Sequence, residues 1–270
     1  MVLYLFAGPS RKSDVESHLK DLAGSGQFSL RFHAFDLERS PEHDLSVNAL
    51  WSNLFAELDA GQWDVVLLSP PCGTFSRARH RWDGRGPRPI RSQAYERGFP
   101  WLSDKDRRAA EEANFFIEQC LKAAASVSRQ GLYWFFEHPQ DLGVAADGVT
   151  PASVWRWEAM RSAVTSSSAA TWAIHQCHFG AETSNPTRLA SNLPACLQFG
   201  QCWPTFDEAG KYVGPLGQCG HWRPPLIGMN DEGKFKTAAS AAYPGRLCKQ
   251  IADYCVSALQ SGDTVGDPGR

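Results

Sequence analysis

A strand that ends at two consecutive prolines constrains this chain more than any other feature. Residues 64–69 read Asp-Val-Val-Leu-Leu-Ser, an apolar run typical of a buried strand, and Pro70 and Pro71 stop it. Because proline donates no hydrogen bond to a neighbouring strand, the chain must leave the sheet there. The turn delivers Cys72 to the carboxyl edge of the sheet, where open α/β folds bind their ligands. A thiol so placed is a candidate nucleophile, and a packed cysteine at a strand end is the alternative.

The composition is that of a globular protein, with 270 residues, 43% hydrophobic and 21% charged. The net charge of −2 does not by itself indicate a nucleic-acid partner, so any basic surface must be local. No apolar stretch approaches the roughly 20 residues that cross a bilayer, and the N-terminus lacks a secretion signal. The eight cysteines are scattered, so reduced thiols in an intracellular protein are expected, in the nucleus or the cytoplasm.

Apolar patterns of strand type and of helix type alternate along the chain. Strands are expected at residues 2–6, 28–35, 64–69, 132–136 and 171–179. Helices are expected near residues 14–22, 50–58, 109–127, 155–164 and 244–259. This alternation predicts an α/β fold with a doubly wound, mostly parallel sheet.

The pattern of alternating elements fails in one stretch and fades at the end of the chain. Residues 194–236 are rich in Gly, Pro, Cys and Trp and are expected to form a small irregular insert. Residues 1–193 and 237–262 would form the core, and residues 263–270 a flexible tail.

A glutamate follows another expected strand, in the segment Phe135-Phe136-Glu137-His138-Pro139. A carboxyl enclosed by aromatic rings would have a raised pKa and could donate a proton; a solvated strand-end acid is the alternative.

Methylating carbon 5 of a pyrimidine needs a group that can donate a proton. A thiolate adding to carbon 6 makes carbon 5 nucleophilic, and a group at ring nitrogen 3 must neutralise the developing charge.

Four segments, in this order, resemble motifs of the cytosine-5 DNA methyltransferase family: residues 6–8, 70–72, 136–139 and 186–189. The resemblance covers about residues 1–193 and the final helix. It implies a Rossmann-like class I methyltransferase with a target-recognition-like insert, and S-adenosyl-L-methionine as its cofactor. Cys72 would be the nucleophile, Glu137 would hold the cytosine ring at nitrogen 3 and its amino group, and Arg188 would contact the cytosine carbonyl.

The same resemblance implies the cofactor site. Asp36 would bind the ribose hydroxyls, as an acid after the second strand does in nucleotide-binding sheets, and Asp44 would contact the adenine. The remaining residues of this expected site are Phe6, Ala7, Gly8 and Pro70.

Three departures from the family pattern are visible. Pro9-Ser10-Arg11 replaces a second glycine, His138-Pro139 replaces asparagine and valine, and Arg188 stands in place of a pair of arginines. Residues 69–76 and 86–89 resemble a divergent, phage-like and dinoflagellate-like branch of the family with a short insert.

Six arginines and one acidic residue lie between residues 77 and 91. Arginine at this density suits phosphate contacts, and an interleaved aromatic ring can stack on a base, so we expect this loop to bind nucleic acid. A solvated loop without a partner is the alternative. The residues expected to bind are Arg77, Arg79, Arg81, Trp82, Arg85 and Arg88.

Several Cys and His side chains raise the question of a metal site. A zinc site could be formed by Cys196, Cys202, Cys219 and His221, but their spacing lacks Cys-x-x-Cys pairs, so we expect no metal. His175 and Cys177 alternate along an expected strand and would share a face in the core.

The leading hypothesis is a DNA cytosine-5 methyltransferase that acts through a covalent Cys72 adduct. Two alternatives are the same chemistry on RNA, such as transfer RNA, and a catalytically idle nucleic-acid-binding homologue. We expect a monomer with no membrane or protein partner.

Overall fold

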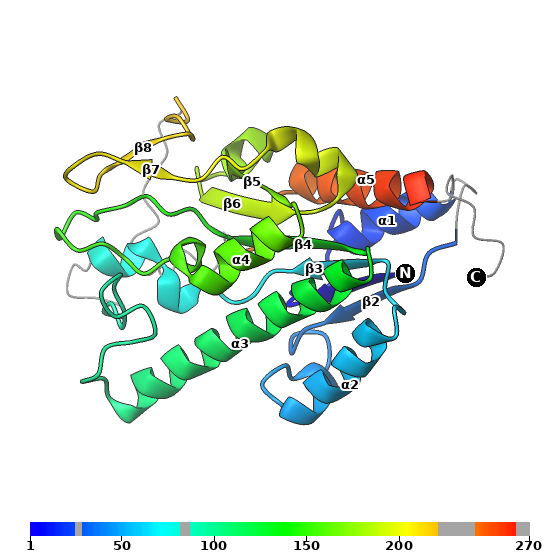
Figure 1. The fold of residues 1–270 in the computed structure, drawn as a ribbon, viewed down its shortest axis with the longest axis horizontal. Coiled ribbons are helices and arrows are strands. Elements are labelled where there is room, and N and C mark those ends of the chain that lie inside the picture. The colour runs from blue at the N-terminus through cyan, green and yellow to red at the C-terminus, as the bar shows by residue number, and fades with distance from the viewer. Residues whose placement is uncertain (25–28, 82–86, 221–240, 263–270) are drawn as a thin grey trace.

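A six-stranded sheet forms the centre of the computed structural model, which describes residues 1–24, 29–81, 87–220 and 241–262 (Figure 1). The spatial order of the strands is β2-β1-β3-β4-β6-β5. β1 to β4 run parallel, whereas β6 is antiparallel to both of its neighbours. The strands are β1 (Val2–Leu5), β2 (Phe32–Phe35), β3 (Val65–Leu68), β4 (Tyr133–Pro139), β5 (Ala170–His175) and β6 (Pro186–Ser191).

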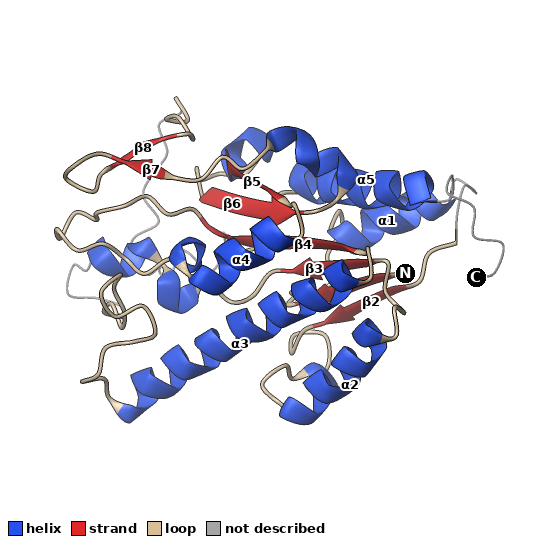
Figure 2. Ribbon diagram, in the orientation of Figure 1, coloured by secondary structure: helices blue, strands red, loops and turns tan. Residues whose placement is uncertain are grey.

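Helices cover both faces of this sheet (Figures 1 and 2). α1 and α5 pack together on one face, and α2, α3 and α4 pack in sequence on the other. The helices are α1 (Val15–Gly24), α2 (Asn48–Asp59), α3 (Asp104–Arg129), α4 (Glu158–Ser166) and α5 (Gly245–Gly262). The predicted α/β fold with a doubly wound, mostly parallel sheet is confirmed.

The side chains of β1 show why the central strands read as continuous apolar runs. Val2 and Tyr4 belong to the core beneath α1 and α5, whereas Leu3 and Leu5 belong to the core beneath α2 and α3. Because successive side chains of a strand point to opposite faces, a strand covered on both sides needs apolar residues at every position.

Two predicted elements differ from the observed ones. β5 ends at His175, and the chain then forms the 3₁₀ turn Gln176–Phe179, which Gly180 closes with a φ of 98°. The expectation that His175 and Cys177 share a strand face is therefore wrong, although both are buried. β2 begins at Phe32 rather than at Phe28, which lies outside the described residues.

The insert contains little regular structure where it is described. The 3₁₀ helix Pro194–Phe199 leads to a two-stranded antiparallel sheet of β7 (Thr205–Phe206) and β8 (Tyr212–Gly214). Residues 221–236 of the predicted insert and the predicted tail 263–270 lie outside the described residues. Within the described ranges, none of the helices is long and apolar enough to cross a membrane.

We expect Leu67→Ala in β3 to lower the free energy of unfolding by about 2–5 kcal/mol, because it leaves a cavity in a fully packed core. Leu67 is 1% exposed and pairs with Tyr4 on one side and Phe135 on the other. Urea unfolding measures the loss. Leu37→Ala is the control, because Leu37 is 58% exposed and its truncation should change stability by about 0.5 kcal/mol or less. Equal effects of the two changes would contradict this packing.

Candidate active site

β1 and β3 end level with Phe136 of β4, and the three parallel strands deliver three chain segments to the same edge of the sheet. Leu5 pairs with Leu68, and Leu68 pairs with Phe136. The residues that follow β1 and β3, and the last residues of β4, therefore lie beside one another at the carboxyl edge. The sequence predicted this arrangement, in which the Gly8 loop, Cys72 and Glu137 share an edge.

Cys72 lies on the turn that follows the two prolines. Its carbonyl accepts a hydrogen bond from the Phe75 N–H at 2.9 Å, which closes the 3₁₀ turn Gly73–Phe75. Burial and, to a smaller extent, the negative charge of Glu137 raise the pKa of the Cys72 thiol to about 12. Cys72 follows Leu68 by four residues and Glu137 follows Phe136 directly, and Leu68 pairs with Phe136, so the strand register brings the thiol and the carboxyl to the same edge of the sheet.

Glu137 ends a chain of buried hydroxyl groups. Its Oε2 accepts a hydrogen bond of 2.7 Å from the Tyr243 hydroxyl, which lies 2.8 Å from the Ser69 hydroxyl. The Ser69 hydroxyl is in turn 3.2 Å from the Tyr4 hydroxyl. Burial raises the pKa of Glu137 to about 7, although the Tyr243 bond opposes this by stabilising the carboxylate. Both forms of Glu137 are therefore present near neutral pH.

The sequence analysis missed Tyr243. This residue lies 106 positions after Glu137, just before α5, and its only local signal is that Pro244 follows it. Burial also raises the Tyr243 pKa well above its usual value, so this phenol is neutral and donates to Glu137.

The loop after β1 is tied to the end of β2. Gly8 has a φ of 67°, which favours glycine, and its N–H donates to Asp36 Oδ2 at 2.9 Å. Arg39, also missed from the sequence, donates to the Gly8 carbonyl at 2.8 Å and pairs with Glu16. A Cβ on Gly8 would meet no atom within 4 Å, so the space beside this loop is open to a ligand.

The remaining predicted cofactor residues occupy different surroundings. Phe6 has a φ of 61°, and its ring centroid lies 4.9 Å from that of Phe116 on α3. Pro70 is buried. Asp44 is half-buried, and its bonds to the hydroxyl and N–H of Ser46 lower its pKa.

Arg188 is not brought to Glu137. In the β4–β6 register Glu137 faces Leu189 and Arg188 faces His138, so Arg188 and Glu137 point to opposite faces of the sheet. The Arg188 guanidinium is buried, where it donates to the side chains of Gln140 and Thr171 and to the Cys202 carbonyl. This arginine therefore joins β4, β5 and the insert, and the structure gives no support to the expected contact with a cytosine.

His138, next to Glu137, is a core residue. It is buried on the face that carries Phe75, whose ring it meets edge-on at 5.0 Å. Burial, aided by the charge of Arg91, lowers the His138 pKa to about 3. The imidazole is neutral at physiological pH.

The two leading arginines of the predicted nucleic-acid loop bind the protein itself. Arg77 donates to the carbonyls of Gly143 and Val144, and Arg79 donates to those of Gly73 and Arg88. Arg81 and Arg88 have exposed side chains, whereas Trp82 and Arg85 lie outside the described residues.

The sixth arginine of the loop, Arg91, is fully buried. Its guanidinium donates to the Glu96 and Ala110 carbonyls and to Asn114, and it lies 4.0 Å from the centroid of the Phe75 ring. Arg91 thus anchors the loop to the turn after Cys72 and to α3. Because it is buried, Arg91 cannot contact a phosphate. The prediction that the six arginines of this loop suit phosphate contacts is therefore wrong for Arg91.

The described residues contain no group of three or more Cys, His, Asp or Glu side chains that could hold a metal. Cys196 is buried in the core, whereas Cys202 is exposed and its thiol donates to the Phe199 carbonyl. Cys219 is half-buried, and His221 lies outside the described residues. The zinc alternative therefore finds no support in the described part of the chain.

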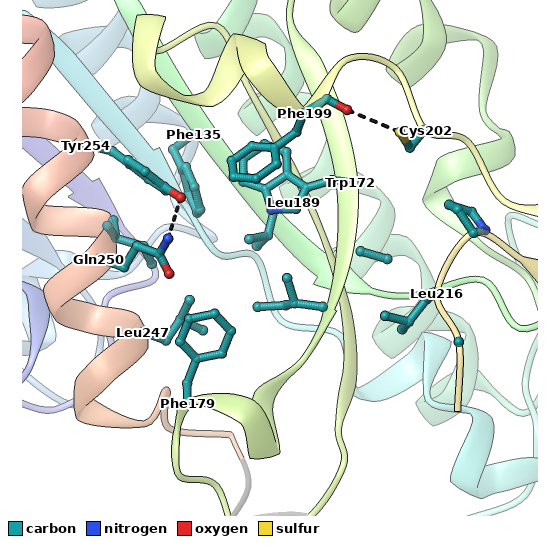
Figure 3. Close-up of a pocket in the computed structure, with 15 residues that line it drawn as sticks. Phe135, Trp172, Phe179, Leu189, Phe199, Cys202, Leu216, Leu247, Gln250 and Tyr254 are labelled. Carbon is teal, nitrogen blue, oxygen red and sulfur yellow. Dashed lines mark hydrogen bonds between the residues drawn. The ribbon is translucent and has the colours of Figure 1, made fainter. Parts of the chain in front are cut away.

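An apolar cavity of about 380 Å³ lies away from these groups, between the sheet and α5 (Figure 3). Phe135 and Leu189 line it from the sheet, and Leu247 and Tyr254 line it from α5. None of the residues predicted to bind the cofactor or to react with cytosine lines this cavity. The zinc candidate Cys202 does.

Comparisons with known proteins show limited similarity. No protein-family model matches the chain, and no curated protein matches it. Among solved structures, the crystal structure of S. pombe Dnmt2 methyltransferase is similar with a TM-score of 0.35 and 16% identity. The match covers 70% of this chain and 49% of that one, so it extends over about half of the Dnmt2 chain. At this TM-score the likeness carries no argument about function.

The raised pKa of Glu137 makes a prediction about stability. Between pH 4.5 and about 7 the folded protein holds a proton that the unfolded chain has lost. The carboxyl therefore contributes stability that is complete below pH 4.5 and is lost as the pH rises through 7. We expect the unfolding free energy of the wild type, minus that of Glu137→Gln, to fall by about 1.4 kcal/mol per pH unit in this window.

The comparison with the variant is needed because His138 acts in the opposite direction. Its contribution is complete above pH 6.5 and is lost as the pH falls through about 3. The two groups offset each other in the wild type between pH 4.5 and 6.5. Urea unfolding of both proteins over a pH series makes the measurement, and a difference independent of pH would show that Glu137 is not buried as described.

Proposed function

We propose that this protein transfers a methyl group from S-adenosyl-L-methionine to carbon 5 of cytosine in DNA. The observation that carries the proposal is the position of Cys72 and Glu137, which follow the paired residues Leu68 and Phe136 at the carboxyl edge of the sheet. Both residues are half-buried, and a thiol and a carboxyl of raised pKa in such a setting can exchange a proton.

The pKa values indicate how protons would move. At neutral pH Cys72 keeps its proton, and a fraction of Glu137 is a carboxylate. As sulfur forms its bond to carbon 6, the thiol proton passes to Glu137, which delivers a proton to ring nitrogen 3. The net reaction adds the sulfur to carbon 6 and the thiol proton to nitrogen 3 of the cytosine ring, so no external base is consumed. When the sulfur–carbon bond breaks after methylation, that proton returns by the same route, and the carbon 5 proton leaves to water.

Residues at the neighbouring strand end fit the cofactor. S-adenosyl-L-methionine would supply the electrophilic methyl group. Asp36 uses one lone pair on each oxygen, for the N–H groups of Gly8 and Glu38, so its carboxylate keeps acceptor capacity for ribose hydroxyls. The open space beside Gly8 allows a ligand to approach the backbone closely.

Two other functions are consistent with this site. The same chemistry could act on cytosine in RNA, since no contact of Cys72 or Glu137 distinguishes ribose from deoxyribose. The second is a nucleic-acid-binding protein that does not catalyse methyl transfer. It is supported by the position of Arg188, which lies away from Glu137 and so leaves the expected set of three catalytic residues incomplete. Methyl-transfer assays with DNA and with RNA, together with covalent trapping on Cys72, separate these alternatives.

The first test is covalent trapping. We expect the wild type, incubated with DNA that contains 5-fluorocytosine and with the cofactor, to form a complex that survives denaturing electrophoresis. The fluorine blocks loss of the carbon 5 substituent, so the sulfur–carbon 6 bond persists. Cys72→Ala should abolish the band.

Cys120→Ala is the matched control, because Cys120 is a buried thiol on α3, and its loss should leave the band intact. A wild type that turns over normally without a trapped band would exclude the covalent mechanism. A trapped band with RNA but not with DNA would show that the substrate is RNA.

The second test concerns Asp36. Losing a hydrogen bond to a charged group costs about 1.5–3 kcal/mol, so Asp36→Ala should weaken S-adenosylhomocysteine binding by about ten- to a hundredfold. Calorimetry makes the measurement. Glu38→Ala, an exposed acid two residues away, should leave the affinity unchanged. Unchanged affinity in folded Asp36→Ala would remove Asp36 from the cofactor site.

A further inference from the structure

Three aromatic side chains gather on the segment that joins the Cys72 loop to α3. The rings of Phe99 and Trp101 are stacked, with centroids 5.1 Å apart and planes at 8° to each other. Tyr95 meets both rings edge-on, at 5.7 and 5.2 Å. We call Tyr95, Phe99 and Trp101 the aromatic platform.

The platform is open to solvent. Trp101 is 67% exposed, more than any other large apolar side chain of the described residues, and Tyr95 is 43% exposed. A stacked ring that shows most of its surface to water gains little from folding, because only its inner face is buried. An exposed aromatic cluster of this kind is typical of a binding surface.

The backbone beneath the platform is held in place. The Phe99 N–H donates to the Ile90 carbonyl at 3.0 Å, and the Tyr95 N–H donates to the Ser92 carbonyl at 3.0 Å. Between them, the buried Arg91 donates to the Glu96 carbonyl and stacks over Phe75, in the turn that begins at Cys72. The platform is therefore coupled through one buried side chain to the turn that carries the nucleophile.

The chain segment that contains the platform is rich in basic residues. Residues 77–108 contain ten Arg and Lys against four Asp and Glu, a net charge of +6. Because the whole chain carries −2, the remaining residues carry −8. Lys105, Arg107 and Arg108 follow the platform directly and are exposed. Such an asymmetry favours a polyanionic partner at this segment.

We propose that the aromatic platform stacks an unpaired base of the nucleic-acid strand that carries the target cytosine, while the exposed Lys105, Arg107 and Arg108 that follow it bind the phosphates. Flat rings beside cationic side chains form the usual surface for unpaired bases, because every base has a face that can stack. A fully paired duplex buries those faces, so the substrate is a strand with unpaired bases near its target. This inference rests on the proposed function.

The test measures binding by fluorescence anisotropy. The probes are two labelled hairpins with the same stem, one with an unpaired loop around a cytosine and one closed by a minimal turn, each made as DNA and as RNA. Trp101→Ala should weaken binding of the looped hairpin by about 5- to 100-fold and leave binding of the closed hairpin nearly unchanged. Trp101→Phe should restore most of the affinity, whereas Trp101→Leu, which keeps an apolar side chain but no ring, should not.

Leu37→Ala is the matched control, because Leu37 is an exposed apolar residue on the loop after β2, outside the basic segment. Equal loss with both hairpins, or equal affinity of Trp101→Leu and Trp101→Phe, would overturn the stacking role. Concentration-dependent dimerisation that Trp101→Ala abolishes, with hairpin binding unchanged, would instead assign the platform to contact between copies.

Two outcomes separate the role of the aromatic platform from methyl transfer through Cys72. If Trp101→Ala binds as the wild type does while the wild type forms the Cys72 adduct, only the platform is wrong. If Trp101→Ala loses the looped hairpin while the wild type forms no adduct, the platform stands and the methyl transfer is wrong.

Discussion

In-register pairing of β1, β3 and β4 brings three distant parts of the chain to one edge of the sheet. Leu5, Leu68 and Phe136 are level across the three strands, so the Gly8 loop, the thiol and the carboxyl follow within a few residues of one line. A shift of one residue in either pairing would turn the side chains of that strand to the wrong face.

Partial burial at this edge sets the protonation of Cys72 and Glu137. The same shielding raises the pKa of the Cys72 thiol and of the Glu137 carboxyl, because each charged form loses its hydration. The hydroxyl of Tyr243 prevents a larger shift of Glu137 by donating a hydrogen bond to it. The result is a thiol that keeps its proton in the free protein and a carboxyl that can accept or donate one near neutral pH.

Part of this arrangement could be predicted from the sequence, because it depends on local patterns. The apolar runs identified β1, β3 and β4, and Pro70-Pro71 located the turn that carries Cys72. The antiparallel β6 was not recognised as a strand. The face on which Arg188 lies, and the bond from Tyr243 to Glu137, depend on pairing between distant segments. Arg77, Arg79 and Arg91 read as a basic loop, yet they bind backbone carbonyls, and no local pattern distinguishes those roles.

We propose that this edge of the sheet methylates carbon 5 of cytosine. The most direct measurement incubates the protein with S-adenosylmethionine that carries a tritiated methyl group and with cytosine-containing DNA, digests the product to nucleosides and separates them. We expect the label to elute as 5-methyldeoxycytidine. A folded protein that binds S-adenosylhomocysteine but places the label on another base or on the exocyclic amine of cytosine, or that transfers no label to DNA or RNA, would contradict it.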